Sequence, residues 1–496
     1  MTGPQDFAAR LAAGLTGYGD RPFIEFGGRW YSGAEIARIH QNIEQLLREN
    51  GVARGEPVGV VVRNRVPHAA AILGFVAAGR PVVMIYSYQS PTGIATDVEQ
   101  LALPAVIADV EDWTAPAVSA ARSTGSAVIS LSPNGVQRLS GRTREQPTDA
   151  ALTEPGVHIL TSGTTGAPKR IPIRTAVLQH TVNSITHALP PDPDAPPDVV
   201  FWPFGSIGVC QLLAAPFVGK QMVLLERFTV TDWVRAIRTY RIRRSGVQPA
   251  IVRMLLDAPE VTAEDLSSLE FIVGGSGPLE PQTRAEFEQR FGIPVLWAYG
   301  ATEFAGSVCS WTPDLYRQYG VSKAGSSGRP LPGVQVRIVD ADSGAELPAG
   351  APGLLEARVQ VMGPQWIRTT DLASVDSEGF VTIHGRADGA INRGGFKILP
   401  ESVRRVLLTH PAVRDAAVVG VPDRRLGQVP FAAVELRSGA TPPGDYELAD
   451  LVREVLPSHH VPVAIAVVDA LPRNAAMKVR PDEVAALYPA TGLSAR

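Results

Sequence analysis

Cysteine is nearly absent from this sequence, since only Cys210 and Cys309 occur among its 496 residues. The two lie far apart in the chain and show no spacing typical of a metal site. The composition therefore excludes a disulfide framework and a cysteine-held metal. We expect both thiols to be reduced and buried in the core of a cytoplasmic protein.

The chain also lacks an excess of one charge and lacks long apolar runs. Its 46 lysines and arginines stand against 49 acidic residues, a net charge of −3, and no basic block occurs. This balance predicts neither a nucleic-acid partner nor a charged membrane anchor. No run reaches the ~18 apolar residues of a spanning helix, and the N-terminus has no signal-peptide pattern. The sequence leaves the oligomeric state open.

Over the first three-quarters of the chain, short apolar runs alternate with helical patterns. Residues 56–64 predict a strand, 67–79 a helix and 80–86 a second strand. The same order recurs at 198–228 and at 269–300. Strands that alternate with helices favour parallel sheets covered by helices on both faces. We therefore predict an α/β fold with two subdomains, each built on a parallel sheet.

From about Ser326 the pattern changes. Three alternating strands, at 334–340, 353–359 and 380–385, follow one another without helices between them. This arrangement favours a small antiparallel β-barrel.

After Gly385, helical patterns return between strands in a segment of about a hundred residues, typical of a separate α+β domain. We therefore predict two domains. Residues 1–385 would form a large N-terminal domain with the two α/β subdomains and the barrel. Residues 386–496 would form a small C-terminal domain.

The stretch "LTSGTTGAPKR", residues 160–170, has the composition of a phosphate-binding loop. It follows the apolar run "GVHI", which predicts a buried strand, and ligands of α/β proteins bind beyond the carboxyl ends of parallel strands. Small residues let successive backbone N–H groups surround an anion, while hydroxyls and Lys169 add donors and a positive charge. The stretch is not a P-loop, because Pro168 precedes the lysine and no serine or threonine follows it.

Five further motifs follow this loop in order. They are "GGSGPL" from Gly274, "YGATE" from Tyr299, "TTDLA" with "DSEGF" from Thr369, "GRADGAINRGGFKILPESV" from Gly385 and "LPRNAAMKVRPDEV" from Leu471. Together with the loop they resemble the adenylate-forming superfamily, which contains acyl- and aryl-CoA synthetases, adenylation domains of peptide synthetases and beetle luciferase. The resemblance runs from about Phe23 to Val484, nearly the whole chain.

The resemblance implies a site for ATP and Mg²⁺. Tyr299 would stack on adenine, Thr302 would contact the phosphate, and Asp371 would receive the ribose hydroxyls, with Arg386 as a second ribose contact. Glu303 would help to hold Mg²⁺, a hard cation that prefers carboxylate oxygen. The positions implied for ATP are Thr161, Ser162, Gly163, Thr164, Thr165, Gly166, Lys169, Gly274, Gly275, Ser276, Tyr299, Gly300, Thr302, Asp371 and Arg386.

The same resemblance implies a catalytic lysine near the C-terminus. Lys478 matches the lysine that bridges the substrate carboxylate and the α-phosphate in this family. The implied catalytic set is Lys478, Glu303, Thr165 and Lys169.

A moving C-terminal domain is also implied, since in this family that domain rotates between two half-reactions. Asp388 matches the hinge position. Gly395 and Lys397 would line the tunnel through which the acceptor arrives.

The acid pocket is a part of the implied site where the sequence departs from its relatives. The pocket candidates are Trp202, Phe204, Ser206, Gly208, Trp297 and Ala298. Three large aromatic side chains favour an aromatic or medium-length acid over acetate. Relatives often carry histidine or an aromatic residue at position 206, and glycine at positions 170 and 477. Here Arg170 follows the phosphate contacts, so we expect activity to survive, and Met477 should stiffen the lysine loop.

The resemblance implies an enzyme that activates a carboxylic acid with ATP and Mg²⁺, releases pyrophosphate and transfers the acyl group to CoA. Two alternatives stay open from the sequence. The acceptor or acid could differ, as in transfer to a carrier-protein thiol or an amine, or in nitrite activation by a diazotising relative. The chain could also be an inactive nucleotide-binding homologue, although Lys169, Glu303, Asp371 and Lys478 are all present.

Overall fold

The computed structural model of the chain describes residues 4–87, 89–133, 135–143, 145, 149–161, 169–186, 194–205, 208–275, 277–301, 304, 306–387, 389–393, 396–423, 425–444, 446–474 and 477–488. Residues 1–245 form one compact unit and residues 246–496 form another. The domain boundary expected between residues 385 and 386 stays a prediction.

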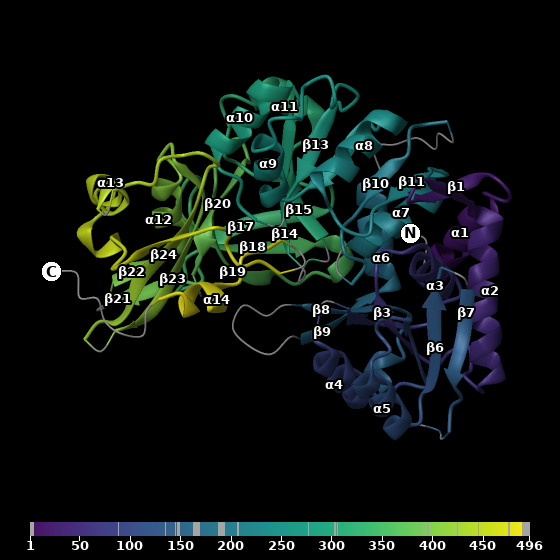
Figure 1. Cartoon of the computed structure of the whole chain (residues 1–496). Coiled ribbons are helices and arrows are strands. Elements are labelled where there is room, and N and C mark those ends of the chain that lie inside the picture. Colours follow the sequence, from purple (N-terminus) through teal and green to yellow (C-terminus); the bar gives the residue numbers. More distant parts are fainter. Residues whose placement is uncertain are drawn as a thin grey trace. The chain divides into compact units, whose positions relative to one another are not determined.

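The first unit is built on a seven-stranded sheet. Its strands are β3 (Val58–Val62), β4 (Val82–Tyr86), β5 (Ala105–Asp109), β6 (Ala127–Ser132), β7 (Gly135–Ser140), β8 (Gly156–Thr161) and β9 (Lys169–Arg174). They lie in the order β7-β6-β5-β3-β4-β8-β9. Figure 1 labels β7, β6, β3, β8 and β9 of this sheet. The five central strands pair in parallel, whereas β7 and β9 pair antiparallel at the two edges. The prediction of a parallel sheet is confirmed for its centre and misses both edges.

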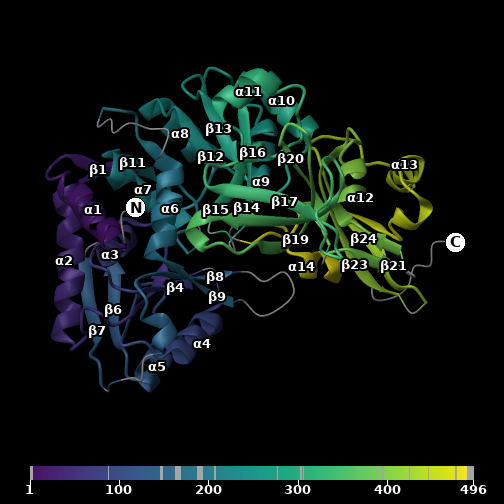
Figure 2. The same cartoon turned by 180° about the vertical axis from the view of Figure 1, so that it is seen from behind.

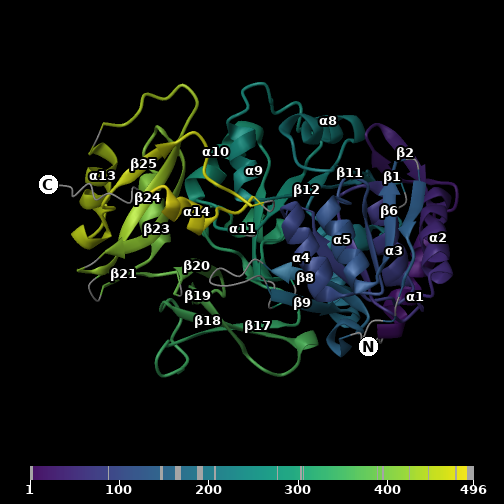
Figure 3. The same ribbon diagram turned by 60° about the horizontal axis from the view of Figure 1, so that its bottom comes forward.

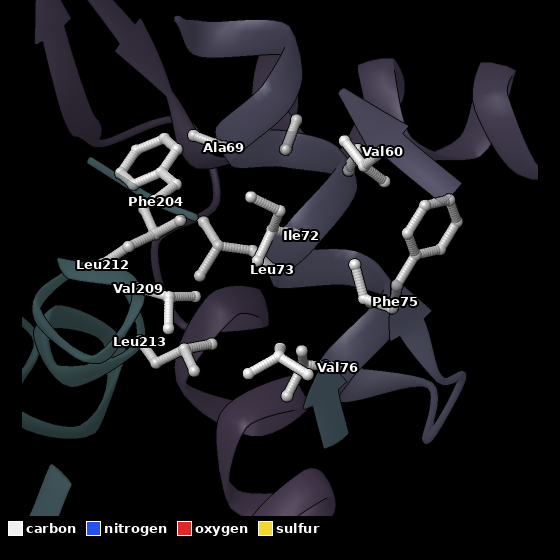
Figure 4. Close-up of a cluster of buried hydrophobic side chains, with 14 of the residues drawn as sticks. Val60, Ala69, Ile72, Leu73, Phe75, Val76, Phe204, Val209, Leu212 and Leu213 are labelled. Atoms are coloured by element: carbon white, nitrogen blue, oxygen red, sulfur yellow. The ribbon is translucent and has the colours of Figure 1, made fainter. Parts of the chain in front are cut away.

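Helices cover both faces of this sheet. The helices of the unit are α1 (Pro4–Thr16), α2 (Gly33–Glu49), α3 (Val66–Ala77), α4 (Pro91–Leu101), α5 (Ala115–Thr124), α6 (Thr175–Thr186), α7 (Gly208–Val218) and α8 (Val230–Tyr240). Successive side chains of β3 belong to two hydrophobic clusters, one on each face of the sheet. Val60 packs in the cluster that contains residues of α3 and α7. Val61 packs in the cluster that contains residues of α4 and α5. In Figure 4, Leu73 of α3 and Leu212 of α7 lie in the first of these clusters.

A second sheet of the first unit carries one of the candidate site loops. It is made of β1 (Pro22–Phe26), β2 (Arg29–Ser32), β10 (Asp198–Val200) and β11 (Met222–Leu224), in the order β10-β11-β1-β2. Strands β1 and β11, which pair in parallel, are labelled in Figure 2. Residues 201–205 follow β10 directly. They include Trp202 and Phe204, so the position of this loop decides where both aromatic side chains lie.

The second unit contains most of a mixed five-stranded sheet, whose first strand begins at Arg244. Its strands are β12 (Arg244–Val247), β13 (Phe271–Gly274), β14 (Val295–Ala301), β15 (Gly306–Ser310) and β16 (Arg329–Pro330), in that order. Strand β14 pairs in parallel with β13, and β15 pairs antiparallel with both β14 and β16. The helices beside it are α9 (Pro249–Leu256), α10 (Pro281–Phe291) and α11 (Pro313–Tyr319). The prediction of a parallel sheet is therefore right for β13 and β14, whereas β15 pairs antiparallel with both of its neighbours.

The three strands expected without intervening helices, together with β19, which the sequence analysis missed, form a four-stranded antiparallel sheet (Figure 3). They are β17 (Val334–Val339), β18 (Gly353–Val359), β19 (Ile367–Val375) and β20 (Val381–Arg386), in that order. Their antiparallel pairing is as predicted, while closure of the sheet into a barrel stays a prediction.

The C-terminal part is an α+β structure, as the sequence predicts. Its strands are β21 (Ile391–Arg393), β22 (Phe396–Ile398), β23 (Val413–Asp423), β24 (Gly427–Leu436) and β25 (Ile465–Val468), and its helices are α12 (Pro400–Leu407), α13 (Glu447–Val455) and α14 (Pro481–Ala486). Strand β24 pairs with β21, β23 and β25. One apolar cluster joins these strands to α12 and α13, and a second cluster joins them to α14.

Cys210 and Cys309 are both buried and unpaired, as expected, and burial raises the pKa of each thiol to about 12. Over the described residues, no helix has both the length and the apolarity needed to cross a bilayer.

Buried His68 predicts an acid-sensitive stability. Its side chain on α3 is completely buried, and burial lowers the pKa of the imidazole to about 3. Because the unfolded chain takes up this proton near pH 6.5, stability should be lost as the pH falls below that value, by about 2 kcal/mol at pH 5. We expect the melting temperature of His68→Leu to fall less between pH 7 and pH 5 than that of the wild type. An identical fall in both proteins would rule out this origin.

Candidate active site

The expected phosphate loop lies between two paired strands. Strand β8 runs parallel to β4, and its last residue, Thr161, lies opposite Lys169, the first residue of β9. The loop therefore begins at the carboxyl edge of the parallel sheet, as predicted. After the loop the chain continues in β9, which pairs antiparallel with β8. The loop residues between these two positions, and the side chains of Thr161 and Lys169, lie outside the described residues.

Arg170 points its guanidinium into the protein. Its Nη1 donates to the Met84 carbonyl of β4 at 2.5 Å, and its Nη2 lies 3.7 Å from Oδ2 of Asp97 on α4. Burial lowers the pKa of this guanidinium, which is 14 % exposed. Arg170 therefore anchors the start of β9 to β4, the strand beyond β8, and to α4. This anchoring is compatible with the expectation that an arginine here leaves activity intact.

Tyr299, Asp371 and Arg386 come together from three strands of the second unit. The Tyr299 hydroxyl donates to Oδ2 of Asp371 at 2.5 Å, and Asp371 lies opposite Arg386 in the β19–β20 pair. Arg386 Nη2 donates to Oγ1 of Thr370 at 2.8 Å. Burial, followed by the Asp371 charge, raises the pKa of the Tyr299 phenol, so this hydroxyl stays protonated and donates.

This arrangement offers both a flat ring and an acceptor for hydroxyl groups. The main chain at Asp371 is held in place, since the Asp371 N–H donates to Oγ1 of Thr369 at 3.1 Å. The ring of Tyr299 is half-buried, so one part of it stays accessible. Such a pair fits the expected contacts with an adenine ring and a ribose diol.

The first two glycines of "GGSGPL", Gly274 and Gly275, have little room for a side chain because β13 packs closely against β14. Gly274 lies opposite Trp297, and a Cβ at Gly274 would come within 1.9 Å of the indole ring. A Cβ at Gly275 would lie 3.0 Å from the Ala298 carbonyl oxygen. Trp297 is 6 % exposed, and its Nε1–H donates to the Gly277 carbonyl at 3.0 Å. The indole is therefore fixed in place, while Ala298 is half-buried on the same strand.

Gly300 has a similar reason to be glycine. A Cβ there would come within 2.2 Å of the Gly306 carbonyl oxygen on β15. The close approach of β14 and β15 therefore excludes a side chain beside Tyr299.

Asn64 is a residue of this region that the sequence analysis missed. Its side chain, 2 % exposed, accepts from the Phe204 N–H at 3.1 Å and donates to the Trp202 carbonyl at 3.0 Å. These two hydrogen bonds hold the loop that carries both aromatic candidates for the acid pocket, Trp202 and Phe204. The only sequence signal was its place just beyond the carboxyl end of β3.

Phe204 and Gly208 have packing roles in this loop. Phe204 is 1 % exposed and belongs to the hydrophobic cluster drawn in Figure 4. A Cβ at Gly208 would lie 2.6 Å from the Trp202 carbonyl oxygen, so a larger residue would displace the loop. Trp202 itself is half-buried.

Lys478 lies at the end of a tight turn. The Met477 N–H donates to the Asn474 carbonyl at 2.8 Å, and the Lys478 N–H donates to Oδ1 of Asn474 at 3.0 Å. Met477 has a φ of 59°, the left-handed conformation that glycine adopts most easily and that costs other residues about 1–2 kcal/mol. Methionine therefore occupies a backbone conformation that favours glycine. Lys478, the next residue, is exposed.

Several expected site residues cannot be placed. Ser206, Ser276, Thr302, Glu303, Asp388 and Gly395 lie outside the described residues, as does the side chain of Lys397. The backbone of Lys397 pairs with Asn392 in the β21–β22 hairpin. Within the described ranges, no group of three or more histidine, cysteine, aspartate or glutamate side chains could hold a metal ion. The Mg²⁺ contact expected of Glu303 therefore stays a prediction.

Comparison with known protein families gives two matches along the chain. Residues 11–364 match the family described as AMP-binding enzyme, and residues 403–478 match the AMP-binding enzyme C-terminal domain. The sequence is 30 % identical over 94 % of its length to a 4-coumarate–CoA ligase-like protein, number 9, of Oryza sativa subsp. japonica, and covers 90 % of that protein.

Two solved structures resemble the chain over nearly its whole length. The ATP-bound MatB of Rhodopseudomonas palustris superposes with a TM-score of 0.82 at 23 % identity, over 97 % of this chain and 99 % of that one. The amide bond synthetase McbA of Marinactinospora thermotolerans superposes with a TM-score of 0.81 at 26 % identity, over 98 % of this chain and all of that one (100 %). At 23 % identity, the likeness to MatB shows the fold alone.

Proposed function

The chain belongs to the AMP-binding enzymes, in the adenylate-forming acyl-CoA synthetase family, and we propose that it converts an aromatic or medium-chain carboxylic acid into its CoA thioester. The observation that carries the proposal is the Tyr299–Asp371–Arg386 group. It offers the ring and the hydroxyl acceptor that a nucleoside needs, at positions where the family motifs expect them.

The proposed reaction has two half-reactions. In the first, a carboxylate oxygen attacks the α-phosphorus of ATP, a new P–O bond forms, and pyrophosphate leaves. In the second, a thiolate attacks the acyl carbon of the adenylate, the C–O bond to AMP breaks, and the thioester and AMP are released. Catalysis of the first step rests on position and charge, because negative charge gathers on the phosphate oxygens.

Each proposed residue has a role in that scheme. Lys478 would neutralise charge at the α-phosphate and orient the carboxylate, and Lys169 with Thr165 would hold the outer phosphates. Asp371 would accept the ribose hydroxyls. Mg²⁺, if held by Glu303, would supply further positive charge to the phosphates.

The second half-reaction would need Lys478 to move away from the thiol. We therefore include in the proposal a C-terminal domain, residues 386–496, that turns about Asp388 and brings Gly395 and Lys397 toward the acceptor tunnel. A hinge of this kind requires a large change at one or two backbone dihedral angles.

An amine acceptor is the second candidate function. The similarity to the amide bond synthetase McbA, at 26 % identity over 98 % of the chain, favours it. Both functions share the adenylate, so they separate only in the second step. Pyrophosphate release should first be measured over a panel of acids, and the best acid should then be offered CoA or a panel of amines. We expect a CoA thioester, and an amide formed with no thioester would favour the second function.

Enlarging Ala298 should change the preferred acid before it changes the use of ATP. This half-buried alanine lies on β14 between Trp297 and Tyr299, so added methyl groups would fill space beside the expected pocket. A steric misfit in a pocket costs about 1–3 kcal/mol, so Ala298→Val should shift the kcat/KM ratio of large to small acids by about 10- to 100-fold. The matched control is Ala466→Val, at a half-buried strand position on β25. An unchanged acid profile in Ala298→Val would place the pocket elsewhere.

A further inference from the structure

The turn that presents Lys478 contains a conformation that methionine adopts at a cost. Met477 is one of three non-glycine residues with a positive φ among the described residues. The turn is closed by the Asn474 N–H, which donates to the Lys478 carbonyl at 2.8 Å, and by a bridge between Arg473 and Val479. Side-chain contacts with the turn are needed to make this one backbone conformation persist.

Arg473 supplies such a contact. Its Nη1 donates to the Met477 carbonyl at 3.1 Å, the peptide group that joins Met477 to Lys478. Its Nη2 forms an ion pair with Oδ2 of Asp415. A guanidinium is planar and rigid, so fixing one of its nitrogens fixes the direction in which the other donates. Arg473 therefore connects the Lys478 turn to a carboxylate on strand β23.

Asp415 is a rigid anchor for this connection. Its side chain is 3 % exposed, and its Oδ1 accepts from the Ala416 N–H at 2.9 Å. Arg404 of α12 donates to the same carboxylate at 2.7 Å, and Arg253 of α9 donates at 3.3 Å. Three arginines around one carboxylate hold the pKa of Asp415 well below its usual range, so it is charged at any pH near neutrality.

A second carboxylate balances this charge. Glu280 pairs with Arg253 at 2.7 Å and with Arg404, and it is 8 % exposed. Removing Arg473 would therefore leave Asp415 buried but still paired with two arginines. The fold should tolerate that change, which makes Arg473 accessible to experiment.

We propose that Arg473 is a positioning residue for Lys478: locked on Asp415, it holds the Met477 carbonyl and so keeps the lysine turn in one conformation without glycine. The inference rests on the proposed role of Lys478 in adenylate formation. It goes beyond that role, because it assigns a function to a residue that touches neither ATP nor the acid. It also gives the buried arginine–carboxylate cluster a consequence for catalysis.

The test uses Arg473→Met, which keeps most of the side-chain length and removes the contacts with the Met477 carbonyl and Asp415. It also removes a longer ion pair, in which Arg473 Nη2 lies 3.8 Å from Oε2 of Glu435. We expect kcat of the adenylation half-reaction to fall by about tenfold or more, because a displacement of ~1 Å can cost up to about a hundredfold. The KM for ATP and the transfer from supplied acyl-adenylate should stay within about twofold of wild type. The matched control is Arg437→Met, which removes an arginine paired with Glu286 of α10 at 3.4 Å. It touches neither Asp415 nor the turn, and its adenylation should be unchanged.

A double-mutant cycle separates positioning from general stability. Met477→Gly relaxes the left-handed position, so in that background Arg473→Met should cost less than about threefold. Additive losses in the two backgrounds would overturn the proposal. So would equal losses in both half-reactions.

Amide hydrogen exchange provides a readout that needs no activity. The N–H groups of Met477 and Lys478 should exchange at least about tenfold faster in Arg473→Met than in wild type or in Arg437→Met. If wild type forms no adenylate with any acid, the proposed function fails, while faster exchange would still support the positioning role. Unchanged exchange would overturn the positioning role whatever the activity.

Discussion

Replacing Lys478 with alanine should slow adenylate formation by about a hundred- to a thousandfold. The proposed lysine neutralises charge that develops at the α-phosphate, and removing one such group from an active site typically costs that much. Conversion of supplied acyl-adenylate to thioester should be largely spared, because that charge is already resolved in the intermediate. Single-turnover assays of each half-reaction measure both values.

The matched control for this variant is Arg480→Ala. Arg480 is an exposed cation two residues further along, and its side chain pairs with Asp482 at 3.4 Å. It should retain both half-reactions within about twofold. Equal loss of both half-reactions in Lys478→Ala would show that the lysine has another role or that the variant is misfolded, which its melting temperature decides.

Replacing Asp371 with alanine should lower kcat/KM for ATP by about ten- to a hundredfold. Hydrogen bonds to a charged group contribute about 1.5–3 kcal/mol each, and the ribose hydroxyls would lose their acceptor. The loss should appear with every acid, because the ribose lies away from the acyl group. Initial rates of pyrophosphate release at varied ATP concentration measure it.

Tyr299→Phe is the companion variant. It removes the hydroxyl that donates to Asp371 at 2.5 Å and keeps the ring proposed to stack on adenine. We expect a smaller loss than in Asp371→Ala, of about threefold to tenfold. A kcat/KM for ATP that is unchanged in Asp371→Ala would remove this carboxylate from the nucleotide site.

Much of the fold could be predicted because it depends on local pattern. The apolar run that became β3 and the helix α3 beside it have the periods of a buried strand and a buried helix. Edge strands were missed for the same reason. Strand β9 reads "KRIPIR", with two charges and a proline in its first four residues, so it resembles a loop until its pairing with β8 is known.

The site divides in the same way. The motif positions Tyr299, Asp371 and Arg386 could be chosen from the sequence, and the structure brings the three together. Asn64 and Arg473 could not be chosen, because each acts on partners distant in the chain. Asn64 binds a loop 138 residues away, and Arg473 binds a carboxylate 58 residues away. The type of one residue and its neighbours in the sequence do not indicate which distant residue it will contact.

The most direct test of the account is acid-dependent exchange of labelled pyrophosphate into ATP, measured without CoA or amine. The account predicts exchange with at least one aromatic or medium-chain acid, no exchange without acid, and loss of exchange in Lys478→Ala. Adding CoA with that acid should then yield AMP and a thioester in equal amounts. A folded enzyme that binds ATP but shows no exchange with any acid of the panel, or that releases ADP, would contradict the central claim.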